Sequence, residues 1–313
     1  MSNNTAIIFP GQGSQCVGML ATLADQYSAI QETFEEASDA LGKDLWSLTV
    51  DGPVEVLNQT ENTQPAMLAA GIAAYRLWLK QGGPGGAIMA GHSLGEYSAL
   101  TAAGALEFAD AVRLVAARGR FMQEAVPAGE GAMAAILGLD DADVISLCEH
   151  AAQSEVAEAV NFNSPGQVVI AGTKTAIERA IVLAREAGAK RALMLPVSVP
   201  SHCALMKPAA GKLAAMLADT RVQMPGIPVL HNADVAVADT VEAIRDKLVK
   251  QLYQPVRWVE TIQAMKAQGM ELLIEPGPGK VLTGLGKRID KTLTFLPVLD
   301  PASLDKALEA CNA

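Results

Sequence analysis

Five residues, Gly91-His-Ser-Leu-Gly95, have the types and the spacing that can make a serine nucleophilic. The apolar run 87–90 precedes them, and a helix-compatible segment begins at Glu96. In such a strand–turn–helix context the glycines let the strand and the helix approach each other, and the turn exposes the serine hydroxyl. Ser93 at a helix N-terminus is therefore the predicted nucleophile, and the N–H group of Leu94 is a candidate donor to an oxyanion. The alternative interpretation is a serine that caps an ordinary helix.

A nucleophilic serine needs a base, and the chain contains four histidines. We rank His202 first because it lies in a loop at a junction between two parts of the chain, and such loops carry function more often than packing. A structural histidine at the junction is the alternative, and His231, which also follows a predicted strand, is the competing base. His92 adjoins the serine, but neighbours in a tight turn point apart, so we expect it to support the site. His150 is expected on the surface.

No acidic residue occupies the place of the third member of a hydrolase triad. Between Ser93 and His202 the Asp and Glu residues fall mostly within predicted helices, and none follows a core strand. An α/β-hydrolase places an acid at a strand end in this interval. We therefore expect a neutral acceptor, such as a backbone carbonyl, to orient the imidazole.

Two glycine-rich segments match phosphate-binding loops only in part. Phe9-Pro-Gly-Gln-Gly-Ser-Gln15 follows the first predicted strand but lacks the third glycine and the later acidic residue of a dinucleotide loop. Gln12, on this Gly-flanked turn, is instead expected to contribute an N–H group to the site of Ser93. Gly277-Pro-Gly-Lys280 is followed by Val281 where a P-loop needs Ser or Thr, so we interpret it as a turn.

One arginine lies at the margin of an apolar helical stripe. In the helix that follows Ser93, the positions 108, 111, 112, 115, 119 and 122 form one face, and Arg118 lies beside it. A guanidinium there needs an anion, which is either a carboxylate of the protein or a carboxylate of the substrate. The sequence leaves both open. If Arg118 faces the site, the acyl group of the substrate carries a carboxylate.

Composition restricts the partners and the compartment. The formal net charge is −10 over 313 residues, which argues against nucleic acid or an anionic membrane as the main partner because both need a cationic surface. The four cysteines have neither CxxC pairs nor the spacing of metal ligands with the histidines, which favours reduced thiols in the cytoplasm and no metal site. The start, Met1-Ser-Asn-Asn-Thr5, lacks the features of a signal peptide, and no run of about 18 apolar residues predicts a membrane span.

Alternating apolar strands and helical segments predict an α/β fold with a largely parallel sheet. Helices are expected over 19–41, 65–81, 95–125, 204–218, 241–251 and 259–268, and strands over 6–9, 87–90, 228–230, 271–275 and 294–298. A middle segment changes character, with strands at 132–137, 156–161, 168–171 and 191–197 and helices at 141–153 and 174–187. This βαββαβ order, with a hairpin turn at 163–166, is the ferredoxin-like unit. We predict a large α/β domain, 1–127 and 200–313, interrupted by a small domain, 128–199, with the site in the cleft between them.

Six ordered motifs resemble those of a known family. They are Phe9-Pro-Gly-Gln-Gly-Ser-Gln15, Gly91-His-Ser-Leu-Gly-Glu-Tyr97, Arg118, Asn161-Phe-Asn-Ser-Pro-Gly-Gln167, Pro200-Ser-His202 and Gln251-Leu-Tyr-Gln-Pro-Val256. Together they resemble the malonyl-CoA:acyl carrier protein transacylases of bacterial fatty acid synthesis, over about residues 5–300. The sequence departs from the common pattern at Gln254, where Asn is expected.

The resemblance implies an α/β-hydrolase-like large domain with a ferredoxin-like insert, and an acyltransferase that uses malonyl-CoA, free-standing acyl carrier protein and no bound cofactor. It implies that Ser93 is acylated with His202 as its base, and that a backbone carbonyl near Gln251 orients the imidazole. It also implies that the N–H groups of Gln12 and Leu94 form the oxyanion hole. Arg118 would then hold the malonyl carboxylate.

Three other functions stay open from the residues. They are a serine hydrolase such as a thioesterase, a non-catalytic acyl-binding module, and a transacylase of other acyl specificity that serves a polyketide synthase. The missing acid and Arg118 argue against the hydrolase. An acidic carrier protein needs a local positive surface on this acidic chain, and Lys190-Arg191 and Lys287-Arg288 are the candidate contacts.

Overall fold

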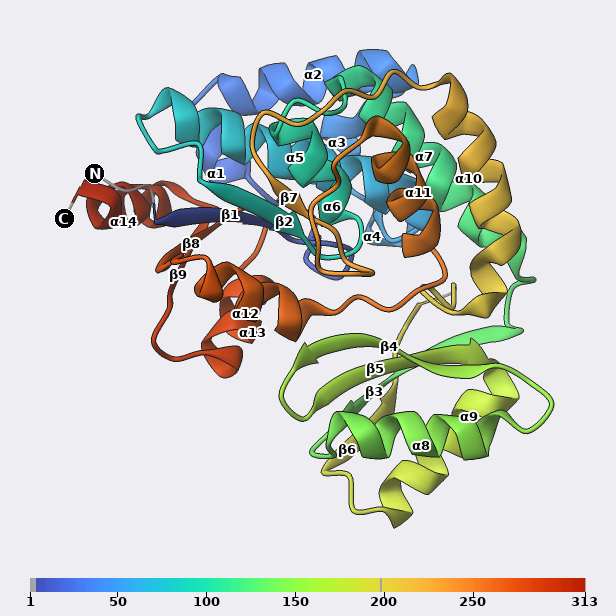
Figure 1. Ribbon diagram of the computed structural model, residues 1–313. Helices are drawn as coiled ribbons and strands as arrows, with labels where there is room; N and C mark the ends of the chain where they lie inside the picture. The colour runs from blue at the N-terminus through green and yellow to red at the C-terminus, as the bar shows by residue number, and fades with distance from the viewer. Residues whose placement is uncertain (1–3, 198, 313) are drawn as a thin grey trace.

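Two β-sheets organise the computed structural model, which describes residues 4–197 and 199–312 (Figure 1). Within these residues the larger sheet has five parallel strands in the order β7-β2-β1-β8-β9. They are β1 (Thr5–Phe9), β2 (Ile88–Gly91), β7 (Val229–Leu230), β8 (Leu272–Pro276) and β9 (Thr294–Val298). The strands β2 and β8 lie on opposite sides of β1. The carboxyl ends of these three strands therefore flank a topological switch point, where α/β folds place ligands.

Helices cover both faces of the parallel sheet. Successive residues of β1 point to opposite faces, so that Ile7 and Phe9 join one apolar core and Ala6 and Ile8 join another. The second core is covered by α12 (Trp258–Ala267) and α13 (Val281–Ile289), below the sheet in Figure 1. All of β1 is buried, as expected for a strand covered on both faces. The predicted α/β fold with a parallel sheet is confirmed.

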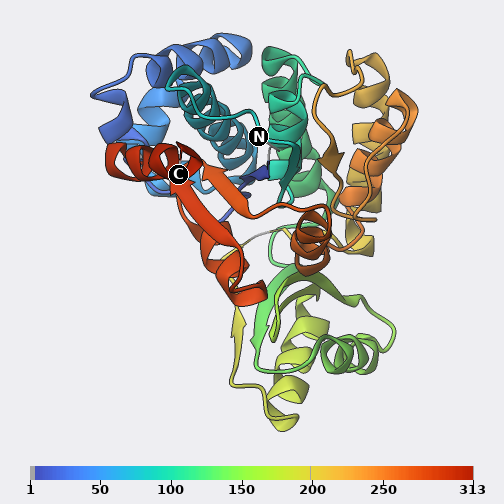
Figure 2. The same ribbon diagram turned by 60° about the vertical axis from the view of Figure 1, so that its left-hand side comes forward.

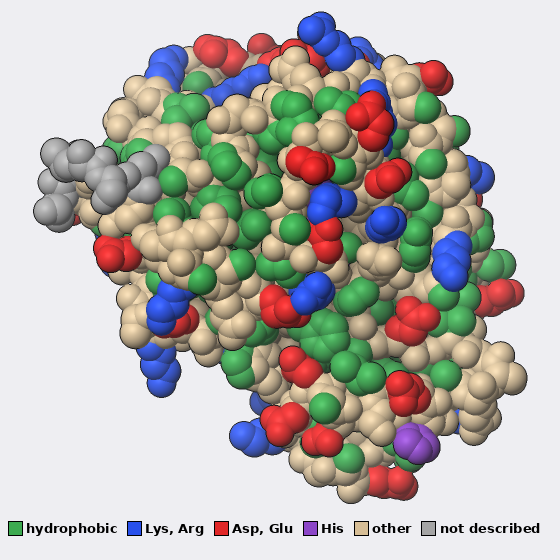
Figure 3. All heavy atoms as spheres, in the orientation of Figure 1, with side chains coloured by type: hydrophobic (Ala, Val, Ile, Leu, Met, Phe, Trp, Pro, Cys, Tyr) green, Lys and Arg blue, Asp and Glu red, His purple; other side chains and the backbone are tan. Residues whose placement is uncertain are grey.

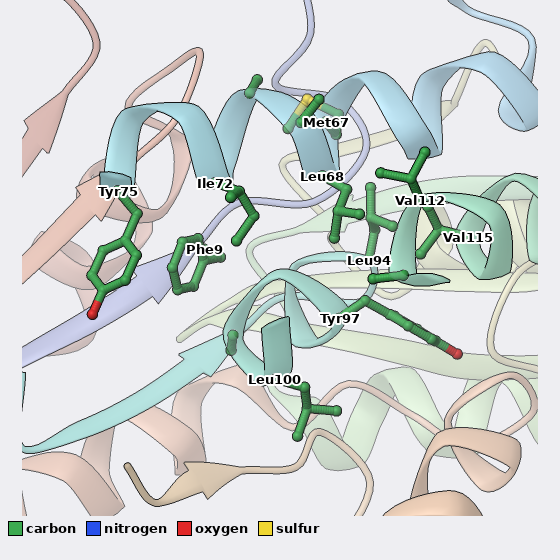
Figure 4. Close-up of a cluster of buried hydrophobic side chains, with 14 of the residues drawn as sticks. Phe9, Met67, Leu68, Ile72, Tyr75, Leu94, Tyr97, Leu100, Val112 and Val115 are labelled. Carbon is green, nitrogen blue, oxygen red and sulfur yellow. The ribbon is translucent and has the colours of Figure 1, made fainter. Parts of the chain in front are cut away.

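The first core lies on the other face of the sheet and contains the larger number of helices. These are α1 (Ala21–Ala24), α2 (Ala29–Leu41), α3 (Leu45–Asp51), α4 (Val54–Leu57), α5 (Thr60–Lys80), α6 (Gly95–Ala102), α7 (Phe108–Ala125), α10 (Lys207–Asp219), α11 (Val241–Gln251) and α14 (Pro301–Asn312). Figure 4 shows Leu94, which precedes α6, among Leu68, Val112 and Val115 of this core. Burial of a leucine side chain contributes about 2 kcal/mol. The core therefore holds the backbone of the turn after β2 in one orientation.

The smaller sheet is built from the middle of the chain. Within the described residues it has four antiparallel strands in the order β4-β5-β3-β6. They are β3 (Gly131–Leu137), β4 (Ala157–Ser164), β5 (Gln167–Thr173) and β6 (Arg191–Met194), and α8 (Asp141–Ala152) and α9 (Lys174–Glu186) pack on one face. The order corresponds to 2-3-1-4 in chain order, which is the ferredoxin-like arrangement. The predicted turn at 163–166 joins β4 to β5.

A short parallel contact joins the small sheet to the rest of the molecule. The N–H of Phe162 donates to the carbonyl of Val256 (3.0 Å), and the N–H of Val256 donates to the carbonyl of Val160 (2.8 Å). Met133 and Val169, on the face of the small sheet opposite α8 and α9, pack with Cys203 of the returning chain. Figure 2 shows this sheet and its two helices as a separate lobe beside the larger α/β layers. The face that looks back toward the large sheet is the one free to line a site.

Several predicted elements differ from the observed ones. The helix predicted over 95–125 is two helices, because Gly104 has a positive φ of 78° that ends the first. The helix predicted over 19–41 is likewise divided into α1 and α2, and the one over 204–218 begins with the 3₁₀ turn Ala204–Met206. The sequence interpretation missed α3, α4, α13 and α14. In α13, Gly284 and Gly286 lower the helix propensity, and packing on the sheet overrides it. The signal-peptide interpretation concerns Met1 to Asn3 in part, and these lie outside the described residues.

Candidate active site

Ser93 lies in a sharp turn at the carboxyl end of β2, directly before α6. Its φ is +51°, which is uncommon for a residue with a side chain and clusters at functional sites. Both glycines of the motif are required because neighbouring backbone atoms lie too close to them for any side chain. A Cβ at Gly91 would lie 1.9 Å from the backbone of Gly95, and a Cβ at Gly95 would lie 2.0 Å from the carbonyl oxygen of Phe9. The sequence therefore folds into the predicted strand–turn–helix geometry.

A hydrogen-bonded chain links Ser93 to His202 and on to Gln251. The Ser93 Oγ lies 2.7 Å from His202 Nε2, and His202 Nδ1 lies 2.7 Å from the main-chain carbonyl oxygen of Gln251. A carbonyl oxygen has no proton, so Nδ1 must donate to it. The other ring nitrogen is then an acceptor, and the serine hydroxyl donates to it. In this arrangement Nε2 can take the serine proton.

The environment of His202 keeps its imidazole neutral. The side chain is 2% exposed, and the residue has a positive φ of 67° that is fixed by a hydrogen bond from its N–H to the carbonyl of Leu252. Burial, and next the positive charge of Arg118, lower the pKa of His202 from 6.5 to about 3. The neutral form is the one that can accept a proton from Ser93.

A cavity of about 460 Å³ opens beside Ser93, between the two sheets. The large part of the chain contributes Gln12, Leu94 and Arg118, and the small sheet contributes Met133 and Val169. Among the described residues, neither the N–H of Gln12 nor the N–H of Leu94 donates to another protein group. The side chain of Gln12 accepts a hydrogen bond from the Thr60 hydroxyl (3.0 Å), which helps to fix the turn after β1.

Arg118, which the sequence places at the margin of the apolar stripe of its helix, is buried, with 1% of its surface exposed. It lies on the cavity wall and over the ring of Tyr97, with 5.3 Å between its Cζ and the ring centroid. Its Nη1 donates to Gln64 Oε1 (2.8 Å) and its Nη2 donates to Gln251 Oε1 (2.9 Å). Within the described residues its Nε has no partner, and both its acceptors are neutral amides. The helix α11, which carries Gln251, covers the guanidinium, and periodicity within α7 alone could not show that.

The other three histidines do not contact the serine hydroxyl. His92 Nε2 donates to Asn163 Oδ1 (2.7 Å), and its ring lies against Trp258 with centroids 5.6 Å apart. It therefore ties the turn that carries Ser93 to the small sheet and to α12. His231 is buried and pairs with Glu96, and His150 is exposed, with its Nδ1 2.7 Å from the carbonyl of Ser146. Of the two competing bases, the structure brings His202 to Ser93 and His231 to Glu96.

Four polar side chains near the site were missed by the sequence interpretation. They are Gln64, Glu96, Asn232 and the side-chain amide of Gln251, all of them buried. Glu96 directly follows the Gly91–Gly95 motif, in a helix whose residues from Gly95 to Leu100 are all buried. A lone charged residue in this run of mostly small and apolar residues was an available signal. Asn232 accepts a hydrogen bond from the Ser93 N–H (2.7 Å) through its Oδ1. It lies 139 positions from Ser93, and no pattern along the chain joins the two.

The described part of the chain contains neither a metal-binding cluster nor a membrane-spanning helix. No group of three or more His, Cys, Asp or Glu side chains there could hold a metal ion. No helix in these residues is long and apolar enough to cross a membrane. The four cysteines are free thiols, of which Cys148 and Cys203 are buried.

This chain combines a parallel-sheet α/β fold with a serine, at a strand–turn–helix elbow, that is hydrogen-bonded to a histidine. These features define the class of serine enzymes that transfer or hydrolyse acyl groups. The model of the acyl transferase domain family matches residues 6–294. The chain is 62% identical to the malonyl CoA-acyl carrier protein transacylase of Escherichia coli (strain K12), over 97% of this chain and 98% of that protein. The chain therefore belongs to the acyl transferase family and, within it, to the malonyl CoA-acyl carrier protein transacylases.

Solved structures agree with this assignment. An acyl carrier protein S-malonyltransferase from Vibrio cholerae has a TM-score of 0.95 at 61% identity, covering 97% of this chain and 99% of that one. A malonyl-transacylase solved in complex with its type II PKS acyl-carrier protein has a TM-score of 0.96 at 56% identity, covering 98% of this chain and 99% of that one. The resemblance seen in the six motifs is confirmed, and so is the mixed fold of a parallel sheet with a small antiparallel one.

Proposed function

We propose that the protein transfers the malonyl group of malonyl-CoA to the phosphopantetheine thiol of acyl carrier protein, through a malonyl ester of Ser93, and so supplies fatty acid synthesis. The observation that carries the proposal is Arg118. Its buried guanidinium lines the cavity of Ser93 and bonds to neutral amides, with no carboxylate in ion-pair distance among the described residues. Glu96 acts on Arg118 only through a longer-range charge interaction. A buried guanidinium without a directly bonded counter-ion is costly, so a ligand carboxylate is the partner that this site fits. The names of the relatives agree with this substrate.

The first half-reaction forms the acyl-enzyme. His202 Nε2 takes the proton of Ser93 Oγ as the oxygen attacks the thioester carbonyl of malonyl-CoA. A C–O bond forms, and the oxyanion of the tetrahedral intermediate accepts hydrogen bonds from the N–H groups of Gln12 and Leu94. The C–S bond then breaks, and the proton on His202 passes to the sulfur of CoA. Ser93 is left as a malonyl ester.

The second half-reaction reverses the chemistry with another thiol. CoA leaves, and the phosphopantetheine thiol of the carrier protein enters the same cavity. His202 takes the thiol proton, the sulfur attacks the ester carbonyl, and the C–O bond breaks with return of the proton to Ser93. Because each product leaves before the next substrate binds, the kinetics are ping-pong. No bound cofactor takes part in this proposal, and malonyl-CoA is a substrate.

Transfer rather than hydrolysis requires that water does not reach the malonyl ester. The cavity carries apolar side chains on its small-sheet side, including Met133, Val169 and Leu195, and Met122 lies next to Arg118. The pantetheine arm of either thiol substrate would fill the remaining volume and exclude water during the reaction. This favours a transacylase over the thioesterase that the motif alone left open.

The proposal extends to the organisation and location of the protein. Segments 1–127 and 200–313 would form one domain around the parallel sheet, and 128–199 the insert, because each sheet has its own apolar core. The free cysteines fit a reducing compartment, and the cytoplasm is the proposed location.

A positive surface for an acidic carrier protein is proposed at the end of the small sheet. The side chain of Lys190 packs over Gly138, whose N–H donates to the carbonyl of Gly166 (2.8 Å). Arg288 Nη1 donates to Gln167 Oε1 (2.8 Å) on the same hairpin. The two basic pairs, 190–191 and 287–288, therefore border one hairpin although they are about a hundred residues apart. Figure 3 shows acidic and basic side chains interspersed over the face that it draws, so charge alone does not identify a contact there.

The mass of the intact protein tests the proposal directly. After exposure to malonyl-CoA we expect the mass of one malonyl group to be added, and lost again when carrier protein with its phosphopantetheine arm is supplied. Ser93→Ala is the control and should gain no mass. No added mass on the wild-type protein would overturn the enzyme proposal. Release of free malonate faster than labelling of the carrier would indicate a thioesterase, and equal loading from acetyl-CoA a transacylase of other specificity.

A further inference from the structure

Glu96 is a buried carboxylate at the centre of a hydrogen-bond network that the proposed reaction does not use directly. Its side chain is fully buried, and no Lys or Arg among the described residues pairs with it. Oε1 accepts a hydrogen bond from His231 Nδ1 (2.6 Å). Oε2 accepts two more, from the N–H of Asn232 and from Gln251 Nε2, each at 2.9 Å. Two donors from the loop after β7 and one from α11 thus converge on one carboxylate.

Both residues held by Glu96 Oε2 contact the backbone of the nucleophile. Asn232 Oδ1 accepts from the Ser93 N–H (2.7 Å), and Asn232 Nδ2 donates to the carbonyl of Gly91 (2.7 Å). Gln251 Nε2 donates to the carbonyl of Ser93 (2.8 Å). The N–H and the C=O of Ser93 are therefore both fixed from outside its own turn. Such support is needed because Ser93 has the strained φ of +51°.

We propose that Glu96, paired with His231, is a positioning residue that holds Asn232 and Gln251 against the backbone of Ser93 and so aims the Ser93 hydroxyl at His202. The inference rests on the proposed acylation of Ser93. Glu96 itself does not line the cavity and touches no substrate. Gln251 extends the effect, because its carbonyl orients His202 and its Oε1 binds Arg118. A shift of about 1 Å at these groups can cost about 100-fold in rate.

What Glu96 supplies in this proposal is the position of two acceptor oxygens rather than its charge. In Glu96→Gln the amide oxygen can take the place of Oε2 and accept from Asn232 and Gln251. The NH₂ group then faces His231 Nδ1, and His231 can become the acceptor there by moving its proton to Nε2. The Gln variant therefore keeps the network, whereas Glu96→Ala leaves three buried donors without an acceptor.

The test measures the rate of Ser93 acylation at saturating malonyl-CoA by rapid quench and intact mass. We expect Glu96→Ala to acylate about 100-fold more slowly than wild type, with little change in the concentration for half-maximal rate. Glu96→Gln should stay within about tenfold of wild type. Asn232→Ala, which leaves Glu96 in place, should lose about tenfold because only the Ser93 N–H and the Gly91 carbonyl lose their partners. If Glu96→Ala does not fold, this variant tests the link between Glu96 and Ser93, and a wild-type rate in Asn232→Ala would overturn the inference.

Glu275, whose pKa is raised by burial to about 7, offers a matched control for the loss of a buried carboxyl side chain. It is also fully buried, and it accepts from the N–H groups of Leu282 (2.9 Å) and Thr283 (2.6 Å) at the start of α13. Glu275→Ala should lower the thermal midpoint but leave the acylation rate within about threefold, which at about 0.6 kcal/mol is within ordinary context effects. Equal rates in Glu96→Ala and Glu275→Ala, or equal loss in the Ala and Gln variants of Glu96, would overturn the inference. An unreactive wild-type protein would instead refute the proposed function.

Discussion

Arg118 and His202 are both held by Gln251, the first by its side-chain Oε1 at 2.9 Å and the second by its main-chain carbonyl at 2.7 Å. One residue of α11 thus places both the proposed cation for the acyl group and the proposed base for the serine. This gives a physical reason for a neutral third member beside the imidazole. A carboxylate there would form an ion pair with Arg118 in a buried site and compete with the carboxylate of the substrate.

Arg118→Met should change selectivity between acyl groups. Methionine keeps most of the packing volume over Tyr97 but removes the charge and its hydrogen bonds. We expect kcat/KM for malonyl-CoA to fall about 100-fold, since a charge-assisted pair contributes about 3 kcal/mol. Transfer from acetyl-CoA, which has no carboxylate, should change less than about tenfold. The measurement is initial-rate kinetics with each thioester. Equal losses for both would show that Arg118 does not bind the acyl carboxylate.

The acylation rate should be insensitive to pH around 6.5, the usual pKa of histidine. Burial and the charge of Arg118 lower the pKa of His202 to about 3, so the imidazole is neutral and able to accept a proton through this range. As pH falls, the rate should decline only when protonation of His202 becomes significant, well below 6.5. Rapid-quench acylation from pH 8 down to about pH 3, with brief exposure to each pH, measures it.

The Arg118→Met variant provides a matched comparison for this profile. Because Arg118 is a positive charge that disfavours the imidazolium, its removal should raise the pKa of His202 and move the acid limb of the profile to higher pH. A wild-type midpoint near 6.5, or a shift to lower pH in the variant, would contradict the assigned electrostatics.

The site was predictable where its geometry is local. The turn of Ser93 is formed within the five residues 91–95. His202 lies where the pattern of strands and helices changes back to that of the proposed large domain, and this change is visible in the sequence. The contact of Ser93 with Asn232 was not predictable, because it depends on β7 lying beside β2 in the sheet. The order of strands in a sheet cannot be deduced from the sequences of the strands themselves. Likewise, the periodicity of α7 places Arg118 beside a stripe but cannot tell that α11 covers it.

The close contact of α6 with β1 can be tested by adding a single carbon atom, the Cβ of alanine, at Gly95. In Gly95→Ala the new Cβ would lie 2.0 Å from the carbonyl oxygen of Phe9, so the helix must move away from the sheet. We expect a loss of at least about 2 kcal/mol in the free energy of unfolding, and reduced acylation because the turn of Ser93 shifts. Urea denaturation followed by circular dichroism measures the stability.

Gly211→Ala is the matched control within a helix. Gly211 is an exposed residue of α10, and a Cβ there would meet no atom within 4 Å. We expect this variant to gain about 0.5–1 kcal/mol because alanine is the better helix former, with unchanged acylation. If both glycine variants were equally stable, the close contact beneath Ser93 would not be what the motif requires.

Charge reversal at the small-sheet hairpin should weaken the carrier protein alone. In the double variant Lys190→Glu and Arg288→Glu, two positive charges become negative and repel an acidic partner. We expect KM for the carrier protein to rise about tenfold, because rim charges contribute up to about 1 kcal/mol each, and the effect should shrink as salt is added. KM for malonyl-CoA should not change, since neither side chain lines the cavity.

Lys80→Glu is the control for this double variant. Lys80 ends α5 on the opposite face of the parallel sheet from α13, so its charge reversal should leave both KM values unchanged. An unchanged KM for the carrier in the double variant would place its contact surface elsewhere.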